Sequence, residues 1–316
     1  MNWLHKIKRN KTFFYASNFI HSLLPNYLYR RKLNYWLSKK SNYSKKTIQE
    51  RLAYYAQFSK QQTSPVSSKI IDIKKPVKGN VYYFDLIKTT RYFKPTYKID
   101  YAFGDITENQ KFPTIVKSRP VQNNGNSVLL KLNSIRHYKF IKDPIPFSKK
   151  KNEAVWRGRV HKENRRLLVD KFKNHPLCNI EEIFSPRKRP HDWNVNYMSI
   201  EDQLQYKYIL SVEGVDVATN LKWILSSNSL CFMPTPKFET WFMEGKLIPN
   251  HHYVHINDDY SDLIEKVNYY MSHENEALII LKNAKSWVAQ FQNKKQERIL
   301  SLLVLEKYFK NTGQSS

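Results

Sequence analysis

The sequence has few of the residues that interrupt a chain or cross-link it. Its 316 residues include only 7 glycines, 14 prolines and 2 cysteines. So little glycine and proline excludes a collagen-like or low-complexity chain. Cys178 and Cys231 are too few for a secreted domain held by disulfides, and we expect two buried thiols. No run reaches the roughly 20 apolar residues that a membrane-spanning helix needs.

The first residues also lack the features of a secretory signal peptide. Residues 1–9 are basic, but the apolar stretch that follows is broken by Asn18, His21 and Ser22. No cleavage site made of small residues comes after it. The sequence therefore predicts a cytoplasmic protein.

Acidic residues are scarce relative to basic ones. The chain has 53 Lys and Arg against 27 Asp and Glu, which gives a formal net charge of +26. Aromatic residues make up 14% of the chain and exclude intrinsic disorder, and this length suggests about two domains with a sizeable core. The excess positive charge predicts an anionic partner, for which nucleic acid, anionic lipid, a sugar nucleotide and an acidic polysaccharide all qualify.

The positive charge is densest in the first sixty residues, which carry thirteen basic residues and one acid, Glu50. Apolar residues recur there at spacings of three and four, which predicts amphipathic helices over residues 1–68. Basic residues on one face and Trp, Phe and Leu on the other are typical of helices that lie on anionic lipid. The alternative is a solvated basic face whose apolar side packs on the protein. We expect residues 1–60 to contact an anionic membrane surface.

From residue 69 onward, strand and helix patterns alternate. Runs rich in β-branched and aromatic residues predict strands at 81–84, 101–103, 114–116, 128–130, 154–157, 208–212, 230–233 and 253–256. Helical spacing predicts helices at 164–173 and 221–226, a helix capped by Asp259 or Ser261, and a helical stretch at 274–309. This alternation predicts parallel sheets in a two-domain α/β enzyme with a cleft.

The strongest candidate for anion binding is a cluster of arginines at the end of a predicted strand. Trp156, Arg157 and Gly158 end that strand, and Arg165 follows in the next helix. Backbone N–H groups at a helix start, together with an arginine fork, can hold a diphosphate. In so basic a chain, the alternative is a solvated arginine face.

Two further loops are candidates for chemistry. The segment 214–222 joins a buried strand to a helix, which is where ligands bind in open α/β sheets, although an ordinary capped turn has the same pattern. Asp105 follows an apolar strand and Gly104, where a carboxylate is either a helix cap or turn former, or a general base.

A metal site is not predicted. Strand alternation places His251 and His255 on one face and His252 on the other, without a fourth ligand, so we interpret them as structural or acceptor-facing histidines. The acids at 258–262 precede a helix, where they complement its dipole. The chain contains no Walker loop, GxGxxG, GxSxG or HExxH motif.

The order of these segments resembles a known family. The run from residue 207 to residue 263, with Val-Trp-Arg-Gly at 155–158 upstream, is similar to glycosyltransferase family 90. That family includes Rumi-type protein O-glucosyltransferases, fungal capsule xylosyltransferases and bacterial lipopolysaccharide A proteins. The bacterial branch fits best, because residues 101–120 and 126–130 also resemble it. The resemblance covers roughly residues 80–270.

The resemblance implies a GT-B fold, with two Rossmann-like domains facing a cleft. The basic helical segment would occupy residues 1–68, and the remaining parts would be an acceptor-side domain at 69–150, a nucleotide-sugar domain at 151–285 and a terminal helix at 286–316 that returns to the first half. Metal-independent, inverting transfer from a UDP-sugar is implied, with Asp105 as the catalytic base. The matching donor-binding positions are Trp156, Arg157, Gly158, Arg165, Gly214, Ala218, Thr219, Asn220 and Lys222, and Glu239 is a further candidate for a ribose hydroxyl.

One departure concerns the donor. Eukaryotic members carry Ser-Phe-Arg where this chain has Ala218, Thr219 and Asn220, so the phosphate-binding arginine is replaced. Lys222, or Thr219 and Asn220 with the helix N-terminus, is expected to take its place.

The sequence thus predicts a glycosyltransferase that adds a hexose or pentose to a lipopolysaccharide core or related bacterial surface glycan. We expect it to need no cofactor or metal and to lie on the inner face of the cytoplasmic membrane. The competing interpretations are a basic nucleic-acid-binding protein, which the charge and the abundant tyrosines favour, and a structural membrane-associated scaffold. No nucleic-acid module is recognised, and we expect no nucleic-acid partner.

Overall fold

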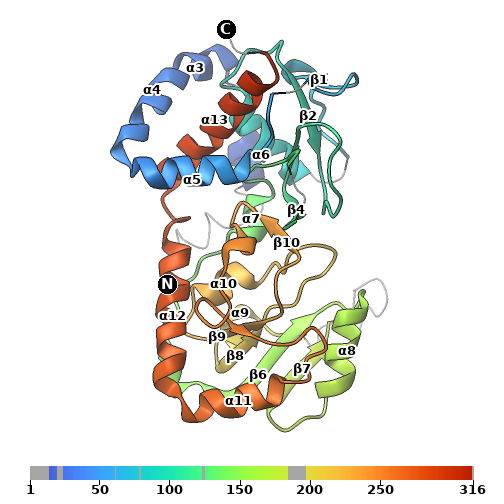
Figure 1. The fold of residues 1–316 in the computed structure, drawn as a ribbon, viewed down its shortest axis with the longest axis vertical. Helices are drawn as coiled ribbons and strands as arrows, with labels where there is room; N and C mark the ends of the chain where they lie inside the picture. The colour runs from blue at the N-terminus through green and yellow to red at the C-terminus, as the bar shows by residue number, and fades with distance from the viewer. Residues whose placement is uncertain are drawn as a thin grey trace. The chain divides into compact units, whose positions relative to one another are not determined.

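The computed structural model describes residues 14–19, 24–60, 62–77, 80–122, 125–183 and 197–314 (Figure 1). The chain forms two compact units. The first contains residues 1–137, 238–242 and 293–316, and the second contains residues 138–237 and 243–292. The chain therefore leaves the first unit twice, after residues 137 and 242, and returns to it at residues 238 and 293.

The first unit is built on a small, mostly parallel sheet with strand order β1-β2-β3-β5. β2, β3 and β5 are parallel, and Tyr101, Ile115 and Val128 lie in register across them. β1 pairs with β2 in the antiparallel sense. The strands are β1 (Ser68–Lys69), β2 (Lys98–Ala102), β3 (Thr114–Val116) and β5 (Ser127–Leu129). β3 and β5 are buried throughout, which places the core of this unit at the centre of the sheet.

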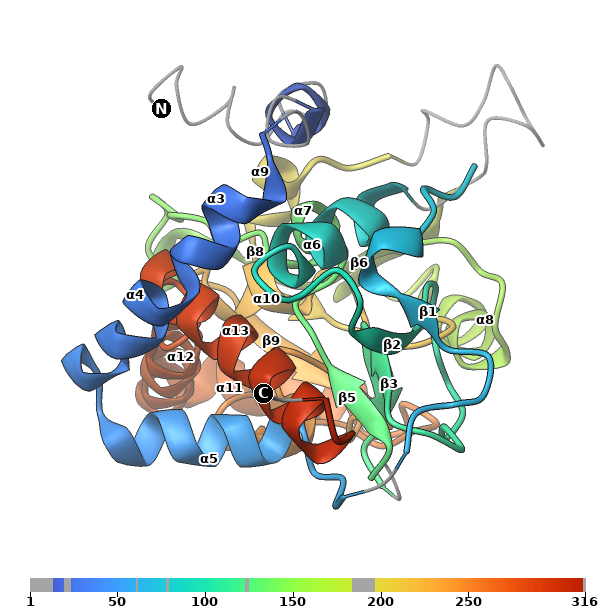
Figure 2. The same cartoon turned by 90° about the horizontal axis from the view of Figure 1, so that it is seen from above.

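Helices surround this sheet. α13 lies against α4, α5 and α6, as Figure 2 shows from above. The helices of the unit are α3 (Asn26–Arg31), α4 (Leu33–Ser38), α5 (Lys45–Tyr55), α6 (Asn80–Thr90), α7 (Ser134–His137) and α13 (Lys294–Asn311), with 3₁₀ turns η1 (Lys39–Asn42) and η2 (Ile70–Asp72).

The strand expected at 81–84 is wrong, because those residues belong to α6. Tyr82, Leu86 and Thr90 are buried at intervals of four, which is the period of a helix packed on one side. The aromatic run favours a strand locally, but the longer apolar pattern decides the structure, because strand preference depends strongly on context.

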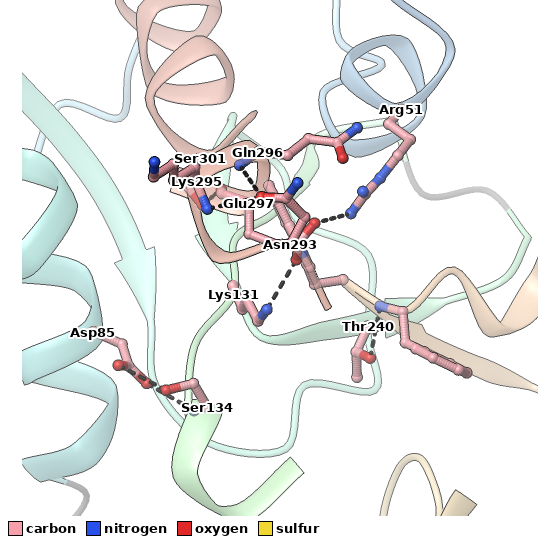
Figure 3. Close-up of polar contacts among 12 residues, drawn as sticks. Arg51, Asp85, Lys131, Ser134, Thr240, Asn293, Lys295, Gln296, Glu297 and Ser301 are labelled. Carbon is pink, nitrogen blue, oxygen red and sulfur yellow. Dashed lines mark hydrogen bonds and ion pairs between the residues drawn. The ribbon is translucent and has the colours of Figure 1, made fainter. Parts of the chain in front are cut away.

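The helical stretch expected at 274–309 is interrupted. α12 (Glu274–Ala289) ends before Asn293, and α13 begins at Lys294. The Asn293 side chain accepts hydrogen bonds from the N–H groups of Lys295 and Gln296, both at 3.1 Å (Figure 3). An asparagine at this position caps a new helix, so the break is built into the sequence.

The first unit also contains a two-stranded ribbon. β4 (Ser118–Pro120) pairs with β10 (Phe238–Thr240) in the antiparallel sense. Arg119 and Glu239 face each other in the register of the ribbon. The segment 238–242 is thereby tied to the first unit.

Part of the expected N-terminal helical segment can be described. Residues 1–13 and 20–23 lie outside the described residues; α3, α4 and α5 are helical, and a basic amphipathic segment over residues 1–68 stays a prediction. The ring of Tyr29 lies 3.8 Å from the Arg91 guanidinium, and the ring of Trp36 lies 4.5 Å from that of Arg298, whereas Tyr35 is exposed. Within the described residues, no helix is both long and apolar enough to span a bilayer. Contact with a membrane stays a prediction.

The second unit has a five-stranded sheet that is parallel throughout, in the order β11-β9-β8-β6-β7. The strands are β6 (Lys151–Gly158), β7 (Cys178–Glu182), β8 (Tyr206–Leu210), β9 (Leu230–Met233) and β11 (Val254–His255). β8 and β9 are buried at every position, and Cys178 and Cys231 are free buried thiols, as expected. The predicted parallel sheets are therefore confirmed.

Helices connect these strands. They are α8 (Glu163–Phe172), α9 (Ile200–Gln203), α10 (Leu221–Leu225), α11 (Leu263–Ser272) and α12, with 3₁₀ turns η3 (Phe147–Lys149) and η4 (Glu244–Lys246). The residue at the N-cap of α11 is Asp262, rather than the expected Asp259 or Ser261.

The strand order identifies where this sheet can bind a ligand. Counted along the chain from β6, the spatial order is 2-1-3-4-5. The order reverses between β6 and β8, and in open α/β sheets ligands bind beyond the carboxyl ends of the strands at such a point. Gly158 is the last residue of β6, and Gly214 lies in the loop that leaves β8.

Candidate active site

Asp105 lies just beyond the end of β2, in the first unit. Gly104, directly before it, has φ +120°, a conformation that residues with a side chain rarely adopt. No helix begins at Asp105, since residues 103–113 contain none. The interpretation of Asp105 as a helix cap is therefore wrong. The Asp105 side chain is 29% exposed.

Two side chains hold the Asp105 carboxylate. Oδ1 accepts a hydrogen bond from Lys117 Nζ at 2.5 Å, in an ion pair, and another from the Tyr82 hydroxyl at 3.3 Å. Partial burial raises the pKa of Asp105, but the hydrogen bond and charge of Lys117, helped by the charge of Arg136, outweigh it and leave the pKa below its usual value. Asp105 is therefore an ionised carboxylate, as a general base must be.

Arg157 lies in β6, and its side chain reaches the neighbouring strand β7. Its guanidinium donates to the backbone oxygen of Asn179 at 2.7 Å and to its side-chain oxygen at 2.6 Å. Burial lowers the Arg157 pKa, and the carboxylate of Glu181 opposes that effect. The preceding residue in β6, Trp156, is also buried. The arginine cluster is therefore partly built into the fold and is not simply a solvated face.

Arg165 joins the two loops at the point where the strand order reverses. From the first turns of α8 it donates to the carbonyls of Val212 at 2.8 Å and Glu213 at 3.1 Å. A Cβ on Gly214 would lie 3.0 Å from its guanidinium, so the glycine makes room for the arginine. The structure thus brings together Arg165 and Gly214, which the sequence had placed in separate motifs. It adds Asn164, which also donates to Glu213 and which the sequence reasoning missed.

Hydrogen bonds and a buried ion pair to other residues of the second unit hold the segment 214–222 in place. Asn220 donates to the Leu210 carbonyl at 3.0 Å and accepts from the Ser211 hydroxyl at 3.3 Å, while Ala218 is buried and Thr219 is half-buried. Lys222 is fully buried and forms an ion pair with Glu244. The Lys222 ammonium therefore already has a carboxylate partner in this structure.

Glu239 lies in the first unit, whereas the other donor-binding candidates lie in the second. It is fully buried, and its carboxylate pairs with Arg119 Nε at 2.8 Å and accepts from the Tyr54 hydroxyl. These partners could not be identified from the sequence, because Arg119 lies 120 residues from Glu239 along the chain.

Of the three neighbouring histidines, His252 is buried and held within the fold. His252 Nδ1 accepts from the Ile248 N–H at 2.9 Å, and burial together with neighbouring His251 lowers the pKa of His252 to about 4. Among the residues that the structure describes, no group of three or more His, Cys, Asp or Glu is placed to hold a metal ion.

Gly158 is required by close packing, which gives a testable prediction. A Cβ at this position would lie 2.4 Å from the ring of Trp156, which is itself buried. We expect Gly158→Ala to lower the free energy of unfolding by about 1–3 kcal/mol, because the indole has no room to move. Gly125→Ala is the control, since nothing lies within 4 Å of its Cβ. A Gly158→Ala variant whose second unit is as stable as in wild type, measured by urea-dependent hydrogen exchange of amides in β8 and β9, would contradict this packing argument.

The family model described as Glycosyl transferase family 90 matches residues 131–311. O-glucosyltransferase LpsA of Dichelobacter nodosus is 43% identical over 263 residues, which cover 83% of this chain and 82% of that protein. The chain belongs to glycosyltransferase family 90. It is therefore a glycosyltransferase, and the resemblance found in the sequence is confirmed.

More distant relatives are eukaryotic. Protein O-glucosyltransferase 2 of Danio rerio is 29% identical over 136 residues, or 42% of this chain and 27% of that protein. Protein O-glucosyltransferase 3 of Homo sapiens is 30% identical over 141 residues, or 43% of this chain and 27% of that protein. The family match begins after Asp105, so a catalytic role for Asp105 is a prediction that rests on its geometry and on the resemblance of residues 101–120.

Proposed function

We propose that this glycosyltransferase transfers glucose from UDP-glucose to a hydroxyl of a lipopolysaccharide core or related bacterial surface glycan, with inversion at the anomeric carbon. The observation that carries the proposal is Asp105, an ionised and partly exposed carboxylate fixed at a strand end. The names of the relatives favour glucose as the sugar, and the similarity to the bacterial relative extends over most of both chains.

In the proposed reaction, Asp105 takes the proton of the acceptor hydroxyl while its oxygen bonds to C1 of glucose. The bond between C1 and the diphosphate oxygen breaks on the opposite face, so UDP leaves and the configuration inverts. Backbone N–H groups at the start of α8 and the basic groups around Gly158 stabilise the negative charge of the diphosphate. We propose that these groups serve where other transferases use a metal.

The proposal assigns a GT-B fold to the chain, with the base on the first unit and the donor site on the second. Support comes from the reversal of strand order beside the loops of Gly158 and Gly214. We further propose that the enzyme lies on the cytoplasmic face of the membrane through residues 1–60. The density of basic residues in that segment supports this location.

Nucleotide and sugar specificity can be tested directly. Thermal shift with UDP-, GDP-, CMP- and dTDP-sugars is expected to show stabilisation by UDP-glucose, because a ligand that binds only the folded state raises the melting temperature. Incubation with UDP-glucose and a truncated lipooligosaccharide is expected to give a β-linked glucose by NMR, in the presence of EDTA. An α-linked product, or loss of transfer in EDTA that added metal restores, would contradict the proposed mechanism.

A further inference from the structure

Three consecutive buried residues hold the loop that carries Asp105. Lys117, Ser118 and Arg119 are at most 1% exposed. Lys117 binds the Asp105 carboxylate, and the Ser118 hydroxyl accepts from the Ile106 N–H at 3.2 Å and donates to the Ile106 carbonyl at 3.3 Å. Arg119 is fixed in turn by Glu239 and by the backbone oxygen of Ser127. The Asp105 carboxylate and the backbone of Ile106 are thus both held by the buried segment 117–119.

The two oxygens of the Asp105 carboxylate have different surroundings. Lys117 and Tyr82 both donate to Oδ1. Within the described ranges of the chain, no hydrogen bond or ion pair reaches Oδ2, and the side chain remains 29% exposed. One oxygen is therefore held while the other is available to a hydroxyl that approaches from solvent.

We propose that Lys117 is a positioning residue: it fixes Asp105 through Oδ1, so that Oδ2 is the oxygen that takes the proton of the acceptor. This inference rests on the proposed role of Asp105 as the base. The burial of Lys117 supports it, because an ammonium that is removed from water is costly to leave unpaired. Lys117 is therefore expected to keep its ion pair with Asp105, whereas an exposed lysine would exchange its carboxylate partner for water.

Lys117 also affects when Asp105 is ionised. The charged and titratable groups that face the carboxylate are Lys117, Arg136 from α7 and Tyr82 from α6. Burial disfavours the ionised form of Asp105, and the hydrogen bond and charge of Lys117 are the largest effects that favour it. Without Lys117 the pKa of Asp105 rises, so a larger share of the enzyme carries a protonated, inactive carboxyl at acidic pH. The acid limb of the kcat profile then moves to higher pH.

The test compares Lys117→Met with Lys117→Arg over pH 5 to 8, with UDP-glucose and a truncated lipooligosaccharide. For Lys117→Met we expect kcat to fall about 100-fold at pH 7.5, as for a misplaced catalytic group, and further at pH 5.5. The KM for UDP-glucose is expected to change less than about threefold, because Lys117 acts on the base. Lys117→Arg keeps the charge and is expected to restore most of the wild-type pH profile.

A matched control separates positioning from stability. Lys150 is buried and pairs with Asp143 at 2.8 Å in the second unit, so Lys150→Met also breaks a buried ion pair. We expect it to lower the melting temperature while the kcat profile of the folded enzyme keeps its shape. If Lys117→Met does not fold, Tyr82→Phe removes the other hydrogen bond to Oδ1. Its kcat is expected to fall about fivefold, with an acid limb at higher pH.

The possible outcomes distinguish the two proposals. If Asp105→Asn is inactive while Lys117→Met keeps the wild-type kcat and pH profile, Lys117 is not a positioning residue and the base assignment survives. A Tyr82→Phe variant identical to wild type overturns the inference if Lys117→Met does not fold. If Asp105→Asn retains activity, the base assignment fails, and the inference about Lys117 fails with it.

Discussion

Asp105→Asn is expected to lower kcat by about 10²- to 10⁴-fold, which is the usual contribution of a general base. The amide has the shape of the carboxylate but cannot take a proton from the acceptor hydroxyl at neutral pH. The amide oxygen can still accept the hydrogen bond of Lys117, so the loop is expected to remain in place. The KM for UDP-glucose is expected to be nearly unchanged, because the base acts on the acceptor.

The control for this substitution lies five residues earlier. Asp100 is in β2, and its carboxylate accepts a hydrogen bond from the Ser64 N–H at 2.8 Å. Asp100→Asn is the same isosteric change on the same strand, and its amide oxygen can still accept that bond. We expect kcat within about threefold of wild type, equivalent to the loss of less than one hydrogen bond. Substantial activity in Asp105→Asn, measured by release of UDP in the presence of acceptor, would remove the proposed base.

The sequence predicted those parts of the fold that local pattern determines. The strands at 114–116 and 230–233 are short apolar runs between turn residues, and they are strands in the structure. The helix at 221–226 is found as α10. The run at 81–84 was misassigned because four aromatic and β-branched residues outweighed a helical period that continues to residue 90.

The candidate positions came from the sequence, whereas the contacts that these residues make did not. Asp105 and Arg165 were identified from family motifs, yet their partners depend on how distant segments pack. Lys117 lies in a stretch that matches the bacterial branch, but nothing in the sequence pairs it with Asp105, twelve residues away. Which buried cation meets which buried carboxylate is decided by tertiary packing, so the ion pair of Lys222 with Glu244 was also missed.

Loss of the Glu297 carboxylate is expected to destabilise the first unit strongly. Its buried carboxylate accepts from Arg51 at 2.7 Å, Lys131 at 2.9 Å and Trp241 Nε1 at 2.7 Å, and Figure 3 shows the two ion pairs. Glu297→Ala leaves the buried Arg51 guanidinium without its carboxylate partner. We expect the free energy of unfolding to fall by about 3–5 kcal/mol, the usual cost of breaking a buried ion pair from one side.

Glu306→Gln is the matched control, because Glu306 lies on the exposed side of α13. It is expected to change the free energy of unfolding by less than about 0.5 kcal/mol. The two units need not unfold together, so the measurement is urea-dependent hydrogen exchange of amides in β3 and β5. A Glu297→Ala variant within about 1 kcal/mol of wild type would show that the remaining partners of Arg51, which include the Tyr55 hydroxyl, are enough to satisfy it.

The size of this effect follows from what Glu297 connects. Its three partners come from α5, from the segment after β5, and from residues 238–242, which re-enter the first unit after about a hundred residues in the second. Trp241 is stacked on Tyr55 at 3.8 Å, so the carboxylate and the stacked rings fix the same segment. Because β10 in that segment pairs with β4, and β4 follows directly after Lys117, we expect Glu297→Ala to loosen the support of Asp105 as well. Activity measured well below the unfolding transition is then expected to fall in Glu297→Ala and to be retained in Glu306→Gln.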